Sequence, residues 1–295
     1  MGRELAAAFP VCRQTFEEAD AVLGEPLSRL CFEGPEDTLM LTENTQPAIL
    51  TVSVAAYRVL SANGMEPAFA AGHSLGEYSA HVAAGTLSFP DAVRMVRRRG
   101  RYMQEAVPVG EGAMAAILGL DAEDVARACE EVADGEVVAP ANLNGPGQVV
   151  IAGATAAVRR AGERAKARGA KRVIPLPVSA PFHCALMKPA EDRLGPELRG
   201  LETRHPRVPI VANVDAEPKR DGPAAVDALV RQVSSPVRWE AVVRRLASEG
   251  VSAYVEVGPG TVLSGLVRKI HRDAVVASFE DPAGLDKIQM LFASQ

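Results

Sequence analysis

Short apolar runs alternate with amphipathic segments along most of the chain. The runs at 67–71, 208–214 and 251–257 have the length of buried strands, whereas 77–84 and 90–103 have the apolar spacing of helices. Strands that alternate with helices are typical of α/β domains with a parallel sheet. We therefore expect this fold class for most of the 295 residues.

The order of elements changes between residues 112 and 178. The pattern there predicts a strand, a helix, two strands, a helix and a strand, at 113–118, 122–132, 136–142, 147–152, 156–168 and 171–176. This β-α-β-β-α-β order is that of ferredoxin-like units. We therefore predict a ferredoxin-like α+β small subdomain at 112–178, inserted into a large α/β-hydrolase-like catalytic subdomain made of 1–111 and 179–295.

The composition excludes several classes of function. A net charge of -5 and an aromatic share of 4% give no basis for nucleic acid or an anionic membrane as partner. The four cysteines are scattered, which favours reduced thiols over a disulfide framework or a metal site. No apolar run reaches the roughly 18–20 residues that a membrane helix needs. We expect a cytoplasmic protein without a metal site.

The candidate nucleophile is Ser74. It lies in Gly72-His73-Ser74-Leu75-Gly76, a G-x-S-x-G sequence between a predicted strand and a predicted helix. This context is that of a nucleophile elbow, a tight turn that exposes the serine hydroxyl. The N–H of Leu75, at the start of the helix, is then an expected oxyanion donor. The same sequence can also form a simple glycine-rich turn.

A nucleophilic serine needs a base, and His183 is the candidate. It lies in the loop 179–184 that follows the small subdomain, and strand-end loops are where α/β sheets place their sites. The other histidines lie inside the elbow, on the following helix or in arginine-flanked stretches: His73, His81, His205 and His271. The residues alone leave a structural role for His183 equally open.

Five blocks of the sequence together resemble one enzyme family. They are 71–80, which contains the elbow, and 98–104, 142–153, 181–187 and 256–260. Each is similar to a block of the malonyl-CoA:acyl-carrier-protein transacylase family, in the family's order. Because the blocks span nearly the whole chain, the resemblance strengthens the assignment of Ser74 and His183.

The resemblance implies covalent transfer of a malonyl group from malonyl-CoA to acyl carrier protein. His183 would activate Ser74, and the backbone carbonyl of Gln232 would orient His183 in place of an Asp. No tightly bound cofactor is implied, and we expect a monomer. Whether the pathway is fatty acid or polyketide synthesis stays open.

The resemblance also implies three substrate-binding residues. Arg99 matches the arginine that binds the malonyl carboxylate, a task that suits a planar guanidinium with two parallel donors. Without the resemblance, Arg99 would be interpreted as part of a solvated helix face with its arginine neighbours. Phe182 accompanies malonyl preference over methylmalonyl, and Met103 matches a pocket-lining position, although its spacing suits a helix core equally well.

The chain departs from the family at its N-terminus. The family begins with a strand and a Gly-Gln-Gly-Ser-Gln loop that supplies a second oxyanion N–H, and this sequence contains no Gly-Gln-Gly-Ser. Loss of one such donor costs on the order of 10²–10³ in kcat. We expect that the natural protein starts upstream of Met1; the alternative is a short and impaired enzyme.

Two other functions compete with acyl transfer. A serine hydrolase or thioesterase would use the same elbow, but it typically has an HGGG-type loop, which this sequence lacks. A non-catalytic protein that binds acyl carrier protein would be consistent with the departure at the N-terminus. Acyl transfer, hydrolysis and non-catalytic binding differ in whether an acyl group on Ser74 passes to acyl carrier protein, passes to water or never forms.

Overall fold

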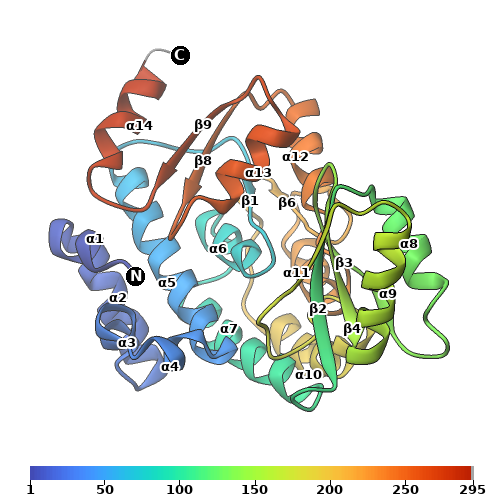
Figure 1. Cartoon of the computed structure of the whole chain (residues 1–295). Coiled ribbons are helices and arrows are strands. Elements are labelled where there is room, and N and C mark those ends of the chain that lie inside the picture. The colour runs from blue at the N-terminus through green and yellow to red at the C-terminus, as the bar shows by residue number, and fades with distance from the viewer. Residues whose placement is uncertain (294–295) are drawn as a thin grey trace.

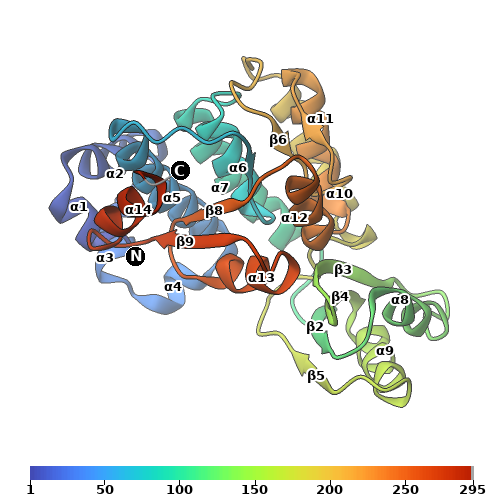
Figure 2. The same ribbon diagram turned by 90° about the horizontal axis from the view of Figure 1, so that it is seen from above.

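The computed structural model describes residues 1–293 as a large helical body with a smaller sheet subdomain on one side (Figure 1 and Figure 2). The large body carries both termini, and the small subdomain is formed by the middle of the chain. No helix within residues 1–293 is long and apolar enough to cross a membrane.

The N-terminal part of the chain is entirely helical. Its helices are α1 (Arg3–Ala8), α2 (Pro10–Leu23), α3 (Leu27–Glu33), α4 (Glu36–Met40) and α5 (Thr42–Ala62). Helix α5 lies at the centre of the large body and packs against α2, α6 and α7. The sequence Asn44-Thr45-Gln46-Pro47 predicts a helix start with Asn44 as the cap, and this prediction is wrong. Helix α5 begins at Thr42, and the Asn44 side chain instead donates to the carbonyl of Thr38.

The strands of the large body pair as two short parallel units. Strand β1 (Ala70–Ala71) pairs in parallel with β6 (Ile210–Val211), which also pairs with the antiparallel β7 (Pro218–Lys219). Strands β8 (Ala253–Val257) and β9 (Val275–Phe279) form the second parallel pair. The parallel pairing fits the predicted class, but β1 and β6 are shorter than the apolar runs at 67–71 and 208–214.

The remaining helices of the large body pack against these strands or against one another. They are α6 (Leu75–Ala83), α7 (Phe89–Glu105), α10 (Lys188–Arg199), α11 (Gly222–Arg231), α12 (Trp239–Ser248), α13 (Val262–Ile270) and α14 (Gly284–Ala293), with 3₁₀ turns at Ala185–Met187 and Gln232–Ser234. The side chain of Ser88 accepts from the N–H of Asp91 and so caps α7. Gly100 lets α7 approach α5 closely, because a Cβ there would lie 2.6 Å from Cα of Glu43.

The small subdomain is a four-stranded antiparallel sheet with two helices. Its elements are β2 (Gly112–Leu118), α8 (Ala122–Glu130), β3 (Val138–Gly145), β4 (Gln148–Ala154), α9 (Thr155–Ala167) and β5 (Arg172–Pro175). The strand order β3-β4-β2-β5 is that of a ferredoxin-like unit. These elements lie within the segment 112–178; the domain boundaries themselves stay a prediction.

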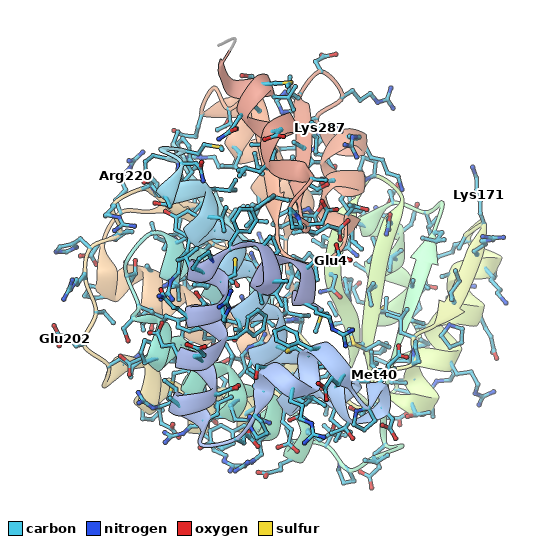
Figure 3. All side chains as sticks on the ribbon, turned by 90° about the vertical axis from the view of Figure 1, so that its left-hand side faces the viewer. Glu4, Met40, Lys171, Glu202, Arg220 and Lys287 are labelled. Carbon is cyan, nitrogen blue, oxygen red and sulfur yellow. The ribbon has the colours of Figure 1, made fainter. Side chains whose placement is uncertain are left out.

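The two faces of this sheet have different partners. Ile117 and Val149 point to the face covered by α8 and α9, whereas Met114 and Val150 point to the opposite face. That second face packs against Cys184, in the loop that carries the candidate base. Figure 3 shows Met40 where the N-terminal helices border the sheet, with Lys171 at its far side. The small subdomain therefore forms one wall of the region around His183.

Candidate active site

The backbone at Ser74 has the geometry of a nucleophile elbow. Ser74 links β1 to α6 with φ 51° and ψ -108°, a conformation that L residues rarely adopt. Gly72 makes the turn possible, because a Cβ there would lie 2.0 Å from the backbone carbonyl of Gly76. Leu75 begins α6, whose first N–H groups have no partner within the helix. The Leu75 N–H thus lies at the N-terminus of α6, in the residue that directly follows Ser74.

His183 lies directly against Ser74. Its Nε2 is 2.7 Å from Oγ of Ser74, and its Nδ1 is 3.0 Å from the backbone carbonyl of Gln232. A carbonyl oxygen can only accept, so Nδ1 carries the proton and Nε2 presents its lone pair to the serine hydroxyl. This tautomer is the one that a general base requires.

Arg99 is buried beside the same hydroxyl. Its side chain, on α7, is 2% exposed. One guanidinium nitrogen, Nη2, lies 3.1 Å from Oγ of Ser74 and 3.0 Å from Oε1 of Gln232, and Nη1 donates to Oε1 of Gln46 at 2.7 Å. The side chain also packs over the ring of Tyr78. The site therefore holds a fixed cation within reach of the nucleophile.

The buried side chains of Asn213, Gln232 and Glu77 form a hydrogen-bond network around the backbone of the elbow. Asn213 accepts from the N–H of Ser74 and donates to the carbonyl of Gly72, both at 2.7 Å. Nε2 of Gln232 donates to the carbonyl of Ser74 at 2.9 Å and to Oε2 of Glu77 at 2.8 Å. The same Oε2 accepts from the backbone N–H of Asn213 at 3.0 Å. These bonds compensate for the strain at Ser74.

Burial shifts the pKa of the titratable groups in this cluster. Burial and then the charge of Arg99 lower the pKa of His183 to about 3, so its imidazole is neutral at neutral pH. Burial also lowers the pKa of His73 and that of Arg99. In contrast, burial raises the pKa of Glu77 to about 7. The cluster therefore contains a neutral base and a carboxyl group that titrates near neutral pH.

A cleft of about 350 Å³ opens onto these groups. It is lined by residues from both subdomains: Met40, Thr42, Thr45, Gln46, Ile49, His73, Ser74, Leu75, Arg99, Met103, Met114, Asn142, Leu176, Val178, Phe182 and His183. Its walls are mostly apolar and its polar groups converge on Ser74, which is typical of small-molecule sites. The predicted substrate residues Arg99, Met103 and Phe182 thus all line one cleft.

The other histidines, and the arginines next to Arg99 in the sequence, do not hydrogen-bond to the Ser74 hydroxyl. His73 lines the cleft, but its Nε2 bonds to Oδ1 of Asn144 at 2.8 Å on the small subdomain. His81 is fully buried on α6. The arginines beside Arg99 form ion pairs with glutamates at the surface: Arg97 with Glu25, Arg98 with Glu197 and Arg101 with Glu43.

Four polar residues that contact the elbow or Arg99 were not found by sequence reasoning: Gln46, Glu77 and Asn213, together with the side chain of Gln232. One signal was available for Glu77, which lies on the first turn of a helix among apolar residues. The amide side chains carry no such signal, because isolated Asn and Gln residues are most often exposed.

Comparisons with known proteins give one consistent result. Residues 1–284 match the family described as the acyl transferase domain. The malonyl CoA-acyl carrier protein transacylase of Escherichia coli K12 is 53% identical over 283 residues, covering 96% of this chain and 92% of that protein. The enzyme of the same name from Bacillus subtilis is 48% identical over 287 residues, covering 97% and 90%.

Solved structures of similar proteins share the fold. An acyl carrier protein S-malonyltransferase from Vibrio cholerae is 50% identical with a TM-score of 0.96, covering 98% of this chain and 94% of that one. A malonyl-transacylase in complex with a type II polyketide acyl carrier protein, PlMCAT:AntF, is 51% identical with a TM-score of 0.96, covering 99% and 94%.

Proposed function

The chain belongs to the acyl transferase domain family, and from this premise we propose that it transfers a malonyl group from malonyl-CoA to the phosphopantetheine thiol of acyl carrier protein. One observation carries the proposal: Oγ of Ser74 lies within hydrogen-bond distance of both Nε2 of His183 and Nη2 of Arg99. A nucleophile, its base and a carboxylate-binding cation therefore meet in one cleft.

In the first half-reaction, Ser74 becomes acylated. Its Oγ attacks the thioester carbonyl of malonyl-CoA while Nε2 of His183 takes the hydroxyl proton. The N–H of Leu75 stabilises the negative oxygen of the tetrahedral intermediate. The carbon–sulfur bond then breaks, His183 returns the proton to the departing coenzyme A thiolate, and a malonyl ester remains on Ser74.

In the second half-reaction, the phosphopantetheine thiol of acyl carrier protein is the nucleophile and Ser74 is the leaving group. His183 accepts the thiol proton as the sulfur attacks the ester carbonyl. The intermediate collapses, the malonyl thioester leaves on the carrier protein, and the proton returns to Oγ of Ser74. The carbonyl of Gln232 orients the imidazole throughout both steps, which is why the site needs no Asp.

Arg99 gives the transfer its preference for a carboxylated acyl group. Two N–H groups of a guanidinium can bind both oxygens of a carboxylate, and burial strengthens this interaction. Met103 and Phe182 line the cleft around the acyl group. The ring of Phe182 would crowd a methyl branch at the α-carbon, so the enzyme prefers malonyl over methylmalonyl.

The two competing functions have less support. A serine hydrolase has no use for a buried arginine beside its nucleophile, and the similar proteins of known name are transacylases. A non-catalytic carrier-binding protein would not need the assembled contacts of Ser74 and His183. A monomeric state and a place in the cytoplasm remain our expectations.

Mass spectrometry of the intact protein after incubation with malonyl-CoA tests the proposal. The chain should gain the mass of one malonyl group, and peptide mapping should place it on Ser74. Ser74→Ala should gain no mass. An unmodified wild-type chain, or a malonyl group retained by Ser74→Ala, would overturn the assignment.

A further inference from the structure

Glu77 is a buried carboxyl group in the active-site cluster to which the proposed mechanism assigns no part. Its side chain is fully buried on α6. Oε2 accepts two hydrogen bonds, from the side chain of Gln232 and the backbone of Asn213. Oε1 is buried and has no hydrogen-bond partner among residues 1–293. An ionised carboxylate in this position would leave one oxygen without a partner, at a considerable free-energy cost.

Gln232 connects Glu77 to Arg99 through its amide. The amide oxygen accepts from Nη2 of Arg99 at 3.0 Å, and the amide nitrogen donates to Oε2 of Glu77 at 2.8 Å. The amide dipole thus has its negative end at the cation and its positive end at the carboxyl group. No carboxylate, Glu77 included, lies within salt-bridge distance of Arg99 among residues 1–293, and the hydrogen-bond acceptors of its guanidinium are Gln46, Ser74 and Gln232.

We propose that Glu77 is the internal counter-charge of Arg99 and takes up a proton from solvent when the carboxylate of an acyl thioester binds to Arg99. The inference rests on the proposed malonyl transfer and adds a positioning residue to it. The incoming carboxylate replaces Glu77 as the negative partner of the guanidinium, and two carboxylates around one buried cation repel each other. The step forms one O–H bond, at Oε1, because Oε2 already accepts two N–H groups.

The surroundings of Glu77 support a proton equilibrium near neutral pH. Burial raises its pKa to about 7 against the opposing effects of Gln232, Asn213 and Arg99. The groups that face it are Arg99 on α7, Asp215 after β6, Tyr78 beside it on α6, and His183 across Gln232. Asp215 raises the pKa of Glu77 further, although it is itself paired with Lys219 and Arg231. His183 stays neutral in the same pH range because its pKa is about 3.

The consequence is a pH dependence that only carboxylated substrates show. Above pH 7 Glu77 of the free protein is mostly ionised, so binding of malonyl-CoA requires proton uptake and weakens as the pH rises. Acetyl-CoA has the same coenzyme but no acyl carboxylate, so its binding should lack this dependence. A purely structural role of Glu77 would affect both thioesters alike.

Calorimetric titration of Ser74→Ala with malonyl-CoA and with acetyl-CoA tests the proposal without acyl transfer. At pH 7.5, in two buffers of different ionisation enthalpy, malonyl-CoA should bind with uptake of roughly half a proton more than acetyl-CoA. Between pH 6 and 9 the Kd of malonyl-CoA should rise roughly three- to tenfold more than that of acetyl-CoA. Equal proton uptake for the two thioesters would overturn the proposal.

Substitutions test whether Glu77, and not another carboxyl group, takes up the proton. In the Ser74→Ala background, Glu77→Gln keeps an oxygen acceptor in the position of Oε2 and should abolish the additional proton uptake seen with malonyl-CoA. The surface control Glu197→Gln should retain that uptake. If Glu77→Gln does not fold, Asp215→Asn offers a second test, since it should move the midpoint of the Kd profile to lower pH. An unchanged midpoint, or uptake that persists in Glu77→Gln, contradicts the role of Glu77. Failure of the wild-type chain to form a malonyl adduct would instead contradict the proposed function.

Discussion

Nε2 of His183 lies 2.7 Å from Oγ of Ser74, although 109 positions separate the two residues in the sequence. Both residues have positive φ angles, 60° at His183 and 51° at Ser74. Such conformations are costly for L residues, so the surrounding structure must hold them in place. Gln232 does so for both, through its backbone carbonyl to His183 and its side chain to the carbonyl of Ser74.

The two glycines of the elbow should respond oppositely to substitution by alanine. A Cβ at Gly72 would meet the backbone of Gly76 at 2.0 Å, whereas a Cβ at Gly76 would meet no atom within 4 Å. Gly72→Ala should therefore lower the free energy of unfolding by about 3 kcal/mol or more. Position 76 lies in α6, so Gly76→Ala should leave the free energy of unfolding unchanged or raise it by up to about 1 kcal/mol.

Urea unfolding of both glycine variants at one pH measures the difference. Because the two substitutions add the same methyl group to the same motif, each serves as the control of the other. Equal losses of stability would show that the close approach of Gly72 to Gly76 does not constrain the turn.

Arg99→Ala should impair the acylation of Ser74 by malonyl-CoA selectively. Loss of charge-assisted bonds worth about 3 kcal/mol corresponds to a loss of roughly 100-fold in kcat/KM. Acylation by acetyl-CoA should change far less, since it offers no carboxylate to the guanidinium. Rapid-quench measurement of adduct formation with both thioesters checks this, with the surface variant Arg98→Ala as control. An equal loss for both thioesters would make Arg99 a structural residue.

Phe182→Ser should widen the range of acyl groups. If the ring crowds a methyl branch by about 1–3 kcal/mol, its removal should raise kcat/KM for methylmalonyl-CoA relative to malonyl-CoA by roughly 5- to 150-fold. Leu176→Ala enlarges another wall of the same cleft and should leave that ratio unchanged. Competition between the two thioesters measures the ratio directly, and an identical ratio in Phe182→Ser would contradict the assignment.

His81 should make the protein sensitive to acid. Burial lowers the pKa of its imidazole to about 3 in the folded state, against about 6.5 in the unfolded chain. The unfolded state therefore binds the proton first, and stability is lost as the pH falls from 6.5 towards 3. At pH 5 this one group should cost about 2 kcal/mol.

His81→Leu isolates this effect because all other titrating groups remain. The difference in unfolding free energy between pH 7.5 and pH 5 should be about 2 kcal/mol smaller in His81→Leu than in the wild type. Denaturant unfolding at the two pH values gives both numbers. The same pH sensitivity in both proteins would show that His81 is not a source of acid instability.

The sequence predicted the elements that show strong periodicity. Strand β8 at 253–257 lies within the predicted run 251–257, and the strand order of the small subdomain agrees with the predicted ferredoxin-like unit. Helices α1 to α4, α10 and α13 were not predicted. Their packing depends on contacts with distant segments, such as that of α10 with α7, which local patterns do not contain.

The residues of the candidate site differ in the same way: some lie in a distinctive local sequence, and others depend on contacts between distant segments. Ser74 could be predicted from its turn, and His183 and Arg99 from the resemblance, because each lies in a distinctive block. Glu77 was not predicted despite its apolar neighbours, since an acidic residue in the first turn of a helix is normally explained by the helix dipole at the surface. Its burial follows from the packing of α6 beneath Gln232, a contact across 155 positions.

The fate of the acyl group on Ser74 tests the central claim most directly. Wild-type protein is mixed with labelled malonyl-CoA, freed of excess thioester, and then mixed with carrier protein bearing its phosphopantetheine thiol. We predict that the label leaves Ser74 and appears on the carrier thiol far faster than malonate appears in solution. Release of the label to water at the same rate with and without the carrier protein would contradict acyl transfer.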